Sequence, residues 1–542
     1  MRIAYDRSFS PYVIPGGVPI GRDVLPDARW FAAMALGQAR GFVGEQLIRA
    51  RERLPGSLRV GRVGREIEAL QQRLVPPAPG RVPTEGDAEF AYQRFAGVNP
   101  LRIARARDLA DIPEKLRLGD ELHGRILGGG SGYSQRANRA PTGATGCHEL
   151  TQRVAHGQIF IVRYDHLRVT SQNDLQEGKF VAPARALFCY APEMDAPFPV
   201  VPLAIECATG RADGETALIT PLAEHRWRDA KRLVGVADIN DAELCLHLAR
   251  AHFMTVPFAI ALRRNLPPAH PLYLFLMPHL RFDMFVERMA WLQGMGKTSG
   301  ILVRSLAGRA QWSQDVARSL YYSLSFREQH FERDLVARGL DSHPVDYPYR
   351  DDGQLVWDAI KRFTGGYLRS IYPTDRAMTA DEALAGFVRE ASDPQGGNVR
   401  GLLAGDRLET VDELIEILTQ VIFVAGPLHA IAHFASAAQL QRTDENPAFL
   451  SANPLSAFGE TDPGPLRAMY QYTRVMATNV RHDRLGDFSR YELGQMPEHR
   501  ARIAAFQAEL QSVERTIEER NARRFAPYIH FLPSRISNGI TV

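Results

Sequence analysis

The sequence from Asp241 to His279 reads DAELCLHLARAHFMTVPFAIALRRNLPPAHPLYLFLMPH and places four of the sixteen histidines in a largely apolar setting. Two of them, His247 and His252, are five residues apart within a predicted helix. Five residues of a regular α-helix set two side chains about 140° apart around the axis, so these imidazoles should diverge. A local widening to i→i+5 hydrogen bonds would bring both to one side, and such π-type turns concentrate at functional sites. The spacing therefore predicts a distorted helix if the two histidines act together.

A second pair of histidines lies in another apolar helix, predicted over Val411–Leu440. His429 and His433 are four residues apart, about 40° around the helix axis, so they share a face and can reach one metal ion. Gly426 and Pro427 just before them should kink this helix. Taken alone, the first pair is better explained as two unrelated core histidines, and the second is explained equally well as core histidines with internal hydrogen bonds.

The chain closes with FLPSRISNGITV, in which Arg535 is the last charged side chain and Val542 the last residue. Chain ends usually fray, yet a terminal carboxylate is an always-available hard oxygen ligand. If this tail threads inward, apolar side chains are what it should carry. Four neutral imidazoles and one carboxylate suit a five- or six-coordinate redox metal such as iron better than a closed zinc site, which prefers four ligands and often sulfur.

Composition sets limits on the class of protein. A chain of 542 residues is long enough for more than one core, and 45% hydrophobic with 23% charged residues is an ordinary globular composition. A net charge of +3 without a dense Lys/Arg run argues against a nucleic-acid partner. Four cysteines without CxxC spacing argue against a zinc site or a disulfide framework. Because we find no apolar leader and no 18-residue uncharged apolar run, we expect a cytoplasmic protein without a signal peptide or membrane span.

Periodicity predicts a mainly α fold with a small β element. Short apolar runs bounded by turn residues predict strands at Ile159–Tyr164, Ala184–Tyr190 and Val200–Cys207. Pro76–Gly86 is dense in helix breakers and is the best candidate for a linker. Helices are predicted over Arg29–Leu54, Val60–Leu74, Ala88–Phe95, Asp241–Arg264, Phe282–Leu292, Gln354–Tyr367, Ala380–Ala391, Val411–Leu440, Gly464–Asn479 and Glu498–Arg524.

Several colinear blocks of the sequence resemble the lipoxygenase family. The family's signature is resembled by WRDAKRLVGVADINDAELCLHLARAH (227–252) and FAIALRRNLPPAHPLYLFLMPHLR (258–281). Further similar segments are FAYQRFAGVNPLRI (90–103), GQIFIVRYDHL (157–167), APFPVVPLAIE (196–206), DLVARGLD (334–341), PLHAIAHF (427–434) and ELQSVERTIEERNARRFAPYIHFLPSRISNGITV (509–542). The resemblance implies one large helical catalytic domain of lipoxygenase type over residues 88–542. Residues 1–87 read as an N-terminal helical extension and linker, a candidate lid of the bacterial type, without the β-barrel domain of plant and animal members.

The resemblance also implies a metal centre with one non-haem iron per chain, manganese being the less expected metal. Its ligands would be the imidazoles and the terminal carboxylate of His247, His252, His429, His433 and Val542, although the family almost always ends in Ile. Glu243 matches a carboxylate or amide that links the metal to the pocket, and Ser436 stands where relatives have its Gln partner. No side chain is implied as catalytic, because a metal-bound hydroxide would abstract the hydrogen. His270 and His279 are not ligands in the family, so we interpret them as structural.

For activity, the resemblance implies insertion of O2 into the cis,cis-1,4-pentadiene unit of polyunsaturated fatty acids to give lipid hydroperoxides. Ala290 stands where Ala accompanies S products and Gly accompanies R products, although plain helix packing would also explain it. Ile239 resembles a residue at the deep end of the pocket, and Arg288 lies beside the position that meets the substrate carboxylate in some animal members. We expect a monomer.

Other functions remain open from the sequence. One is a lipoxygenase-like hydroperoxide isomerase, another a haem protein, and a third a non-catalytic lipid-binding helical protein whose histidines only pack. Peripheral membrane contact through Arg29–Leu54 is a further option, since its apolar face can meet lipid or be buried as core or lid.

Overall fold

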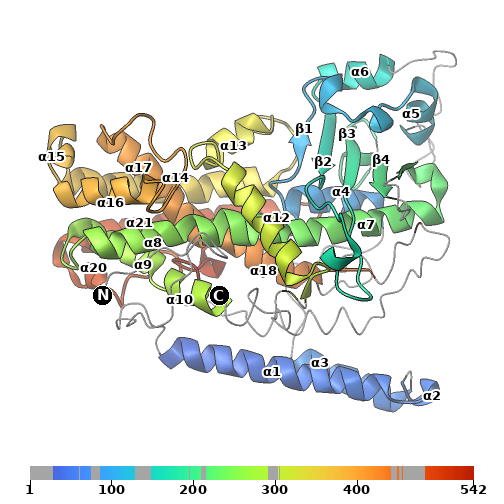
Figure 1. Ribbon diagram of the computed structural model, residues 1–542, viewed down its shortest axis with the longest axis horizontal. Coiled ribbons are helices and arrows are strands. Elements are labelled where there is room, and N and C mark those ends of the chain that lie inside the picture. Colours follow the sequence, from blue (N-terminus) through green and yellow to red (C-terminus); the bar gives the residue numbers. More distant parts are fainter. Residues whose placement is uncertain are drawn as a thin grey trace.

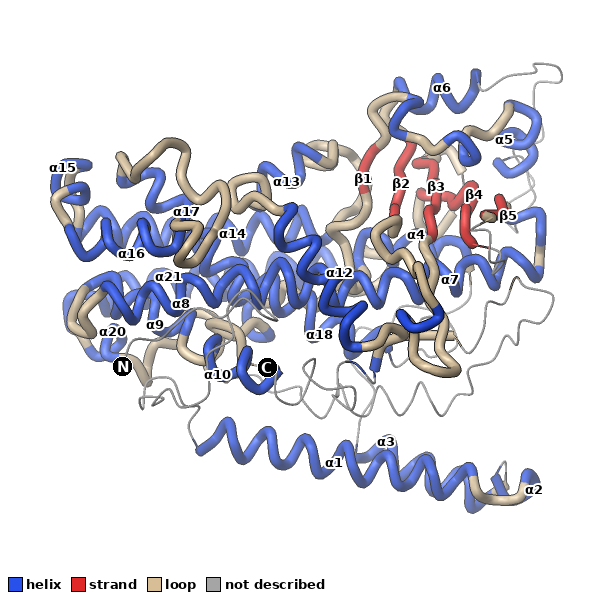
Figure 2. The backbone as a smooth tube through the Cα atoms, in the orientation of Figure 1, coloured by secondary structure: helices blue, strands red, loops and turns tan. Residues whose placement is uncertain are grey.

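In the computed structural model, a body of packed helices carries a small sheet at one end, and further helices lie along one side (Figure 1). The tube in Figure 2 shows that the strands are confined to that end, so helices surround the rest of the described interior. This agrees with the predicted mainly α fold with a small β element. The residues that the structure describes are 28–59, 61–74, 86–127, 148–194, 196–208, 215–290, 303, 305–440, 448–450, 455 and 482–541.

One continuous helix of 41 residues runs from His225 to Asn265. It consists of α7 (His225–Asp241), a π-helix (Ala242–His252) and α8 (Phe253–Asn265). The sequence predicted a start only at Asp241, because the beginning of α7, HRWRDAKR, is too polar to show apolar periodicity. The predicted π-type distortion between the two histidines is confirmed.

A second helical run crosses the interior beside the first. It consists of α17 (Val411–Phe423), a π-turn (Val424–Leu428) and α18 (His429–Leu440). The side chain of Thr410 caps the start by accepting a hydrogen bond from the backbone N–H of Glu413. Pro427 has no N–H to donate, and the chain accommodates it in the π-turn, at the site where the sequence predicted a kink.

Both helical runs have the length and hydropathy to cross a membrane by composition alone. However, 94% of the most apolar window in each is buried within the protein. They are therefore core helices in this fold, and their apolar character reflects packing against each other and against the surrounding helices.

The sheet has five antiparallel strands that pair in chain order. They are β1 (Ala104–Arg105), β2 (Ile159–Arg163), β3 (Ala184–Tyr190), β4 (Val200–Ala208) and β5 (Thr216–Ile219). The three central strands were predicted, whereas β1 and β5 are too short to produce a recognisable apolar run. Both faces of the sheet are buried, one in the main core with Phe160 and the other in a smaller cluster with Leu187.

Helices cover the remaining length of the molecule. Predicted helices overlap α1, α3, α4, α10, α14, α16 and α21. The helices α9, α12 and α13 were not predicted. In α9, Pro271 at the start and Pro278 near the end resemble the prolines of a loop, so the sequence did not indicate a helix there. The predicted helix Gly464–Asn479 and nearly all of the predicted linker lie outside the described residues. The remaining α-helices among the described residues are α1 (Ala28–Glu52), α2 (Gly56–Arg59), α3 (Arg62–Leu74), α4 (Asp87–Ala96), α5 (Asp120–Leu127), α6 (His148–Ala155), α9 (Pro271–Leu280), α10 (Asp283–Met289), α12 (Ala310–Ser323), α13 (Phe331–Ala337), α14 (Pro348–Ile371), α15 (Asp375–Thr379), α16 (Glu382–Ser392), α20 (Glu492–Gln495) and α21 (Arg500–Asn521).

A buried polar network fixes the long helix just before its π-helical part. Asp241 is fully buried and accepts hydrogen bonds from Asn99 (2.5 Å), from Nε of Arg102 (2.7 Å) and from Nε2 of His166 (2.6 Å). Burial alone would raise the pKa of Asp241, but Arg102 and His166 together hold it well below its ordinary value. An ionised Asp241 thus ties the segment after α4 and the turn after β2 to the helix that carries the first two histidines.

Candidate metal centre

Four imidazoles from the two central helical runs meet in the interior. Nε2 of His247 lies 3.1 Å from Nε2 of His252 and 3.2 Å from Nε2 of His429. His433 joins them, because ring nitrogens of His247, His429 and His433 all lie within 4.8 Å of one another. The structure therefore brings together all four histidines that the sequence singled out.

Local backbone geometry makes this convergence possible. In the π-helix, i→i+5 bonding places residues five apart on one side, so the rings of His247 and His252 lie 4.6 Å apart. His429 opens α18 directly after the π-turn, and its ring is nearly parallel to that of His433 at 5.6 Å. The two distortions aim both pairs at one point.

The four imidazoles are buried, none being more than 8% exposed. Burial, with the neighbouring imidazoles adding to it, lowers the pKa of His252 well below its ordinary value. A neutral imidazole keeps a lone pair that a metal ion can accept. His252 can thus donate a nitrogen lone pair at neutral pH.

Glu243 orients one member of the cluster. Its Oε1 lies 3.0 Å from Nδ1 of His247, one helical turn along the π-helix. A carboxylate at this distance accepts the Nδ1–H, fixes the ring orientation and leaves Nε2 available to a metal. The sequence predicted that Glu243 links the metal to the pocket, and the structure places Glu243 against His247. Its predicted partner Ser436 lies on α18, but the side chain of Ser436 is outside the described atoms.

The spacing of the nitrogens fits a metal ion. Two nitrogens bound at right angles to one metal, with bonds of about 2.1 Å, lie about 3.0 Å apart. The observed separations of 3.1 and 3.2 Å agree with that value. A set of imidazoles is typical of first-row metals such as iron, whereas structural zinc sites prefer thiolates. The donor set therefore fits the iron that the sequence predicted.

A second group of potential ligands lies near the start of the π-helix. Ligand atoms of His166, Asp241 and Cys245 also lie within 4.8 Å of one another. The carboxylate of Asp241 is already engaged by Arg102 and Asn99, and burial raises the pKa of the Cys245 thiol well above its ordinary value. Since the thiol stays protonated and the carboxylate is engaged, we assign no metal to this group.

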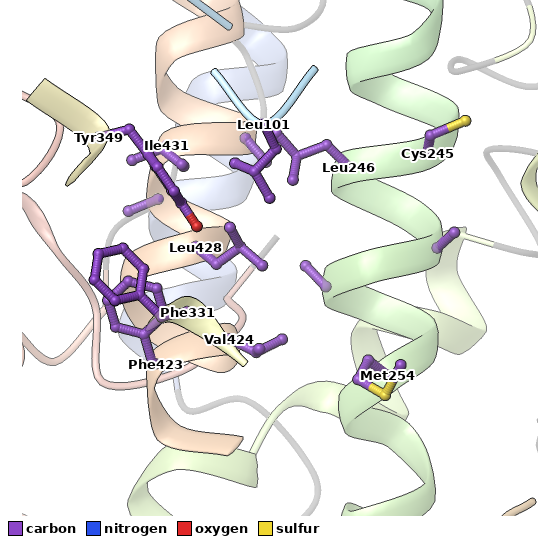
Figure 3. Close-up of a cluster of buried hydrophobic side chains, with 14 of the residues drawn as sticks. Leu101, Cys245, Leu246, Met254, Phe331, Tyr349, Phe423, Val424, Leu428 and Ile431 are labelled. Atoms are coloured by element: carbon purple, nitrogen blue, oxygen red, sulfur yellow. The ribbon is translucent and has the colours of Figure 1, made fainter. Parts of the chain in front are cut away.

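Apolar side chains of the main core lie on both helical runs that carry the imidazoles, and the ring of Phe434 contacts those of His429 and His433. Figure 3 shows Leu246 on the long helix facing Leu428 and Val424 on the second helical run, with Met254 further along the long helix. Leu246 and Leu428 directly precede the ligand candidates His247 and His429, and all four apolar residues belong to the main core. An apolar shell of this kind limits access of water to a metal and lowers the local dielectric constant.

The end of the chain runs inward beside this cluster. Ile536, Asn538, Ile540 and Thr541 are each 1% exposed, as the apolar tail predicted. The tail passes close to the second helical run, since a Cβ added at Gly426 would lie 2.8 Å from the carbonyl oxygen of Ser537. Val542 is outside the described residues, so its carboxylate remains a predicted ligand.

His279, which the sequence left as structural, anchors this tail. Its Nδ1 lies 2.8 Å from the carbonyl oxygen of Asn538, so Nδ1–H donates to that oxygen. Burial lowers the pKa of His279 to about 4, and the ring is therefore neutral at pH 7. His270 has a different structural role, capping α9 and bonding Asp381.

The pocket candidates lie on the elements around the cluster. Ile239 is buried in α7, eight residues before His247. Arg288 lies in the last turn of α10 and Ala290 directly follows that helix, which packs against α8; both are partly exposed. Their roles toward a substrate remain predictions.

Sequence reasoning missed two contributors to this region. The Asp241 network was hidden because its members lie in three separate segments, although all three, residues 90–103, 157–167 and 227–252, belong to the family-like blocks. Trp30, whose indole reaches the tail, lies in a helix that was predicted but whose partner the sequence does not indicate.

Comparisons with known proteins agree with this geometry. A family model described as Lipoxygenase matches residues 80–441. Linoleate 9/13-lipoxygenase from Pseudomonas aeruginosa is 30% identical over 481 residues, which cover 83% of this chain and 66% of the relative. Seed linoleate 9S-lipoxygenase from Glycine max is 31% identical over 388 residues, covering 66% of this chain and 43% of the relative. This chain spans two thirds or less of the length of these two relatives.

The fold has solved counterparts as well. The crystal structure of "Delta413-417:GS LOX" superposes with a TM-score of 0.79 at 22% identity, covering 96% of this chain and 76% of the other. At that level of identity the likeness shows the fold alone.

Proposed function

Because this chain belongs to the lipoxygenase family, we propose that it is a non-haem iron dioxygenase acting on polyunsaturated fatty acids. It would insert O2 into a cis,cis-1,4-pentadiene unit and release a lipid hydroperoxide. The observation that carries this proposal is the convergence of four buried imidazoles on one point. The names of the two relatives refer to linoleate, which contains such a unit, and this supports a fatty-acid substrate.

The proposed metal site consists of His247, His252, His429 and His433, with the carboxylate of Val542 as a fifth ligand. Removing a hydrogen from a bis-allylic carbon is a reaction that no side-chain base performs at a useful rate, and iron bound at this site would supply the electron acceptor for it. Manganese is the second choice of metal. The chain's own residues keep the imidazole of His252 neutral by burial, fix the ring of His247 through Glu243, and hold all four imidazoles in the buried interior.

The pocket candidates Ala290, Ile239 and Arg288 bear on the stereochemistry of the product and on the orientation of the substrate. We propose that Ala290 favours S hydroperoxides, that Ile239 lines the deep end of the pocket, and that Arg288 meets the substrate carboxylate. The helix that ends beside Ala290 packs against α8, which continues directly from the ligand segment, and this supports the assignment. Replacing Ala290 by Gly should raise the fraction of R product in a chiral product analysis.

We also propose that residues 1–87 are a helical extension and linker, and that Arg29–Leu54 within it contacts membranes peripherally. Phe42 on α1 is 64% exposed, and further exposed apolar side chains are Phe31, Leu36, Val43, Leu58, Val63 and Leu70. Residues 28–74 contain nine arginines and four glutamates. Exposed apolar side chains together with excess positive charge suit an anionic lipid surface. Phe42→Glu should weaken co-sedimentation with anionic vesicles, and equal binding of both proteins would contradict this assignment.

The test of the proposed activity is oxygen uptake with linoleate and arachidonate, followed by chiral analysis of the products. Uptake with formation of hydroperoxides supports a dioxygenase. Consumption of added hydroperoxide without oxygen uptake would instead identify a hydroperoxide isomerase. Neither reaction, in a protein without bound metal, would point to a non-catalytic lipid-binding protein.

A further inference from the structure

Trp30 joins the start of the N-terminal extension to the end of the chain. Its indole Nε1–H donates to the carbonyl oxygen of Thr541 at 2.6 Å, across 511 residues of sequence. Trp30 is 5% exposed and Thr541 is 1% exposed, so water does not compete for this bond. The carbonyl that accepts it belongs to the peptide bond between Thr541 and Val542.

The same tryptophan packs into an apolar cluster separate from the main core. Its ring meets that of Phe285 edge to face at 5.4 Å, and the cluster also contains Phe282, Val286 and Ile540. Phe285 and Val286 lie on α10, whereas Ile540 is part of the tail. Along the side of the body shown in Figure 1, α1 therefore contacts both α10 and the tail.

The tail is clamped from two sides over its last residues. Asn538 is held by its own hydrogen bonds to Asp483, Gly486 and Asp487, and its carbonyl accepts from His279. Three residues further on, Trp30 holds the carbonyl of Thr541. Chain ends fray unless such contacts tie them down. The hydrogen bond from Trp30 fixes the peptide group directly before the terminal residue, and the orientation of that peptide group limits the directions open to the terminal carboxylate.

We propose that Trp30 is a positioning residue for the metal centre. By fixing the last peptide group, it directs the carboxylate of Val542 toward the four imidazoles. The extension then contributes to metal retention as well as covering the tail. This inference rests on the proposed function in one respect, namely that the terminal carboxylate is a ligand.

The decisive variants separate the hydrogen bond from the packing. Trp30→Phe keeps an aromatic ring in the cluster and removes the indole N–H, whereas Trp30→Ala removes both. A matched control is Trp312→Phe, because the indole of Trp312 also donates to a backbone carbonyl, that of Arg168, at 2.8 Å. Iron per chain after purification and the rate of iron removal by a chelator are measured for each protein, together with the melting temperature.

Groups that orient metal ligands typically change metal affinity by about 10- to 100-fold when removed. We expect chelator to strip iron from Trp30→Phe roughly tenfold faster than from the wild type. Trp30→Ala should lose it faster still, and Trp312→Phe should match the wild type. Wild-type rates of iron loss in Trp30→Phe, with or without a lower melting temperature, would reduce Trp30 to a packing residue and overturn the inference. A wild-type protein that holds no metal at all would refute the proposed function instead.

Discussion

Replacing Gly539 by alanine should dislodge the tail from the metal centre. A Cβ added at this glycine would lie 2.1 Å from the carbonyl oxygen of His279 and 2.7 Å from its carbonyl carbon. Both atoms are backbone in α9, so no flexible side chain can move aside to make room. Contacts below 3.0 Å essentially never occur for real Cβ atoms, and the tail must therefore shift.

The size of the effect follows from this overlap. Relieving a 2.1 Å contact to an acceptable distance requires a displacement of about 1 Å. Overpacking of this kind typically destabilises a folded protein by about 1–3 kcal/mol. Metal–ligand distances tolerate only about ±0.2 Å, so a carboxylate that follows three residues later would leave its bonding position. We therefore expect a modest loss of stability and a large loss of iron.

The assay compares Gly539→Ala with Gly405→Ala by iron per chain and by urea unfolding. Gly405 is an exposed loop residue, and a Cβ added there would meet no atom within 4 Å. The control should retain wild-type iron content and stability. If Gly539→Ala retains both as well, the close approach of the tail to α9 does not position a ligand, and the reasoning fails.

Three further predictions concern the surrounding charges and the product. Asp283 is 1% exposed, and burial raises its pKa to about 7, so the folded protein keeps this proton to a higher pH than the unfolded chain does. Its burial therefore lowers stability progressively from about pH 4 to pH 7. Asp283→Asn should gain stability relative to the wild type between pH 5 and 7, by up to about 1.4 kcal/mol per pH unit in urea unfolding; a constant difference would contradict the assignment. Arg102→Ala leaves the fully buried carboxylate of Asp241 without its guanidinium and should destabilise the protein by about 3–5 kcal/mol, whereas a change below 1 kcal/mol would refute a structural role for the pair. Ala290→Gly should raise the proportion of R hydroperoxide, and an unchanged enantiomeric ratio would remove Ala290 from stereocontrol.

Much of the site could be predicted from local sequence. The five-residue spacing of His247 and His252 is incompatible with a regular helix if both bind one ion, and that conflict led to the predicted π-helix. His429 and His433 needed only the ordinary period of an α-helix. Apolar side chains in the last residues indicated a buried tail, because exposed ends have no reason to carry them.

Other features depend on contacts between segments far apart in the chain. The indole of Trp30 finds its acceptor 511 residues away, and nothing in the sequence near Trp30 points to that partner. His279 gave no sign of its role, because its partner is a backbone carbonyl that any residue would supply. The helix α9 was missed for a local reason, since prolines at both ends resemble loop signals.

The most direct test of the whole account is the metal content of the purified protein. Elemental analysis should find one iron per chain, and the visible spectrum should show no Soret band. Replacing His429 by alanine should reduce the iron to a small fraction of that amount, since one of the converging imidazoles is lost. A wild-type protein with neither iron nor manganese in stoichiometric amount would contradict the account, because four buried, converging imidazoles would then have only a packing role.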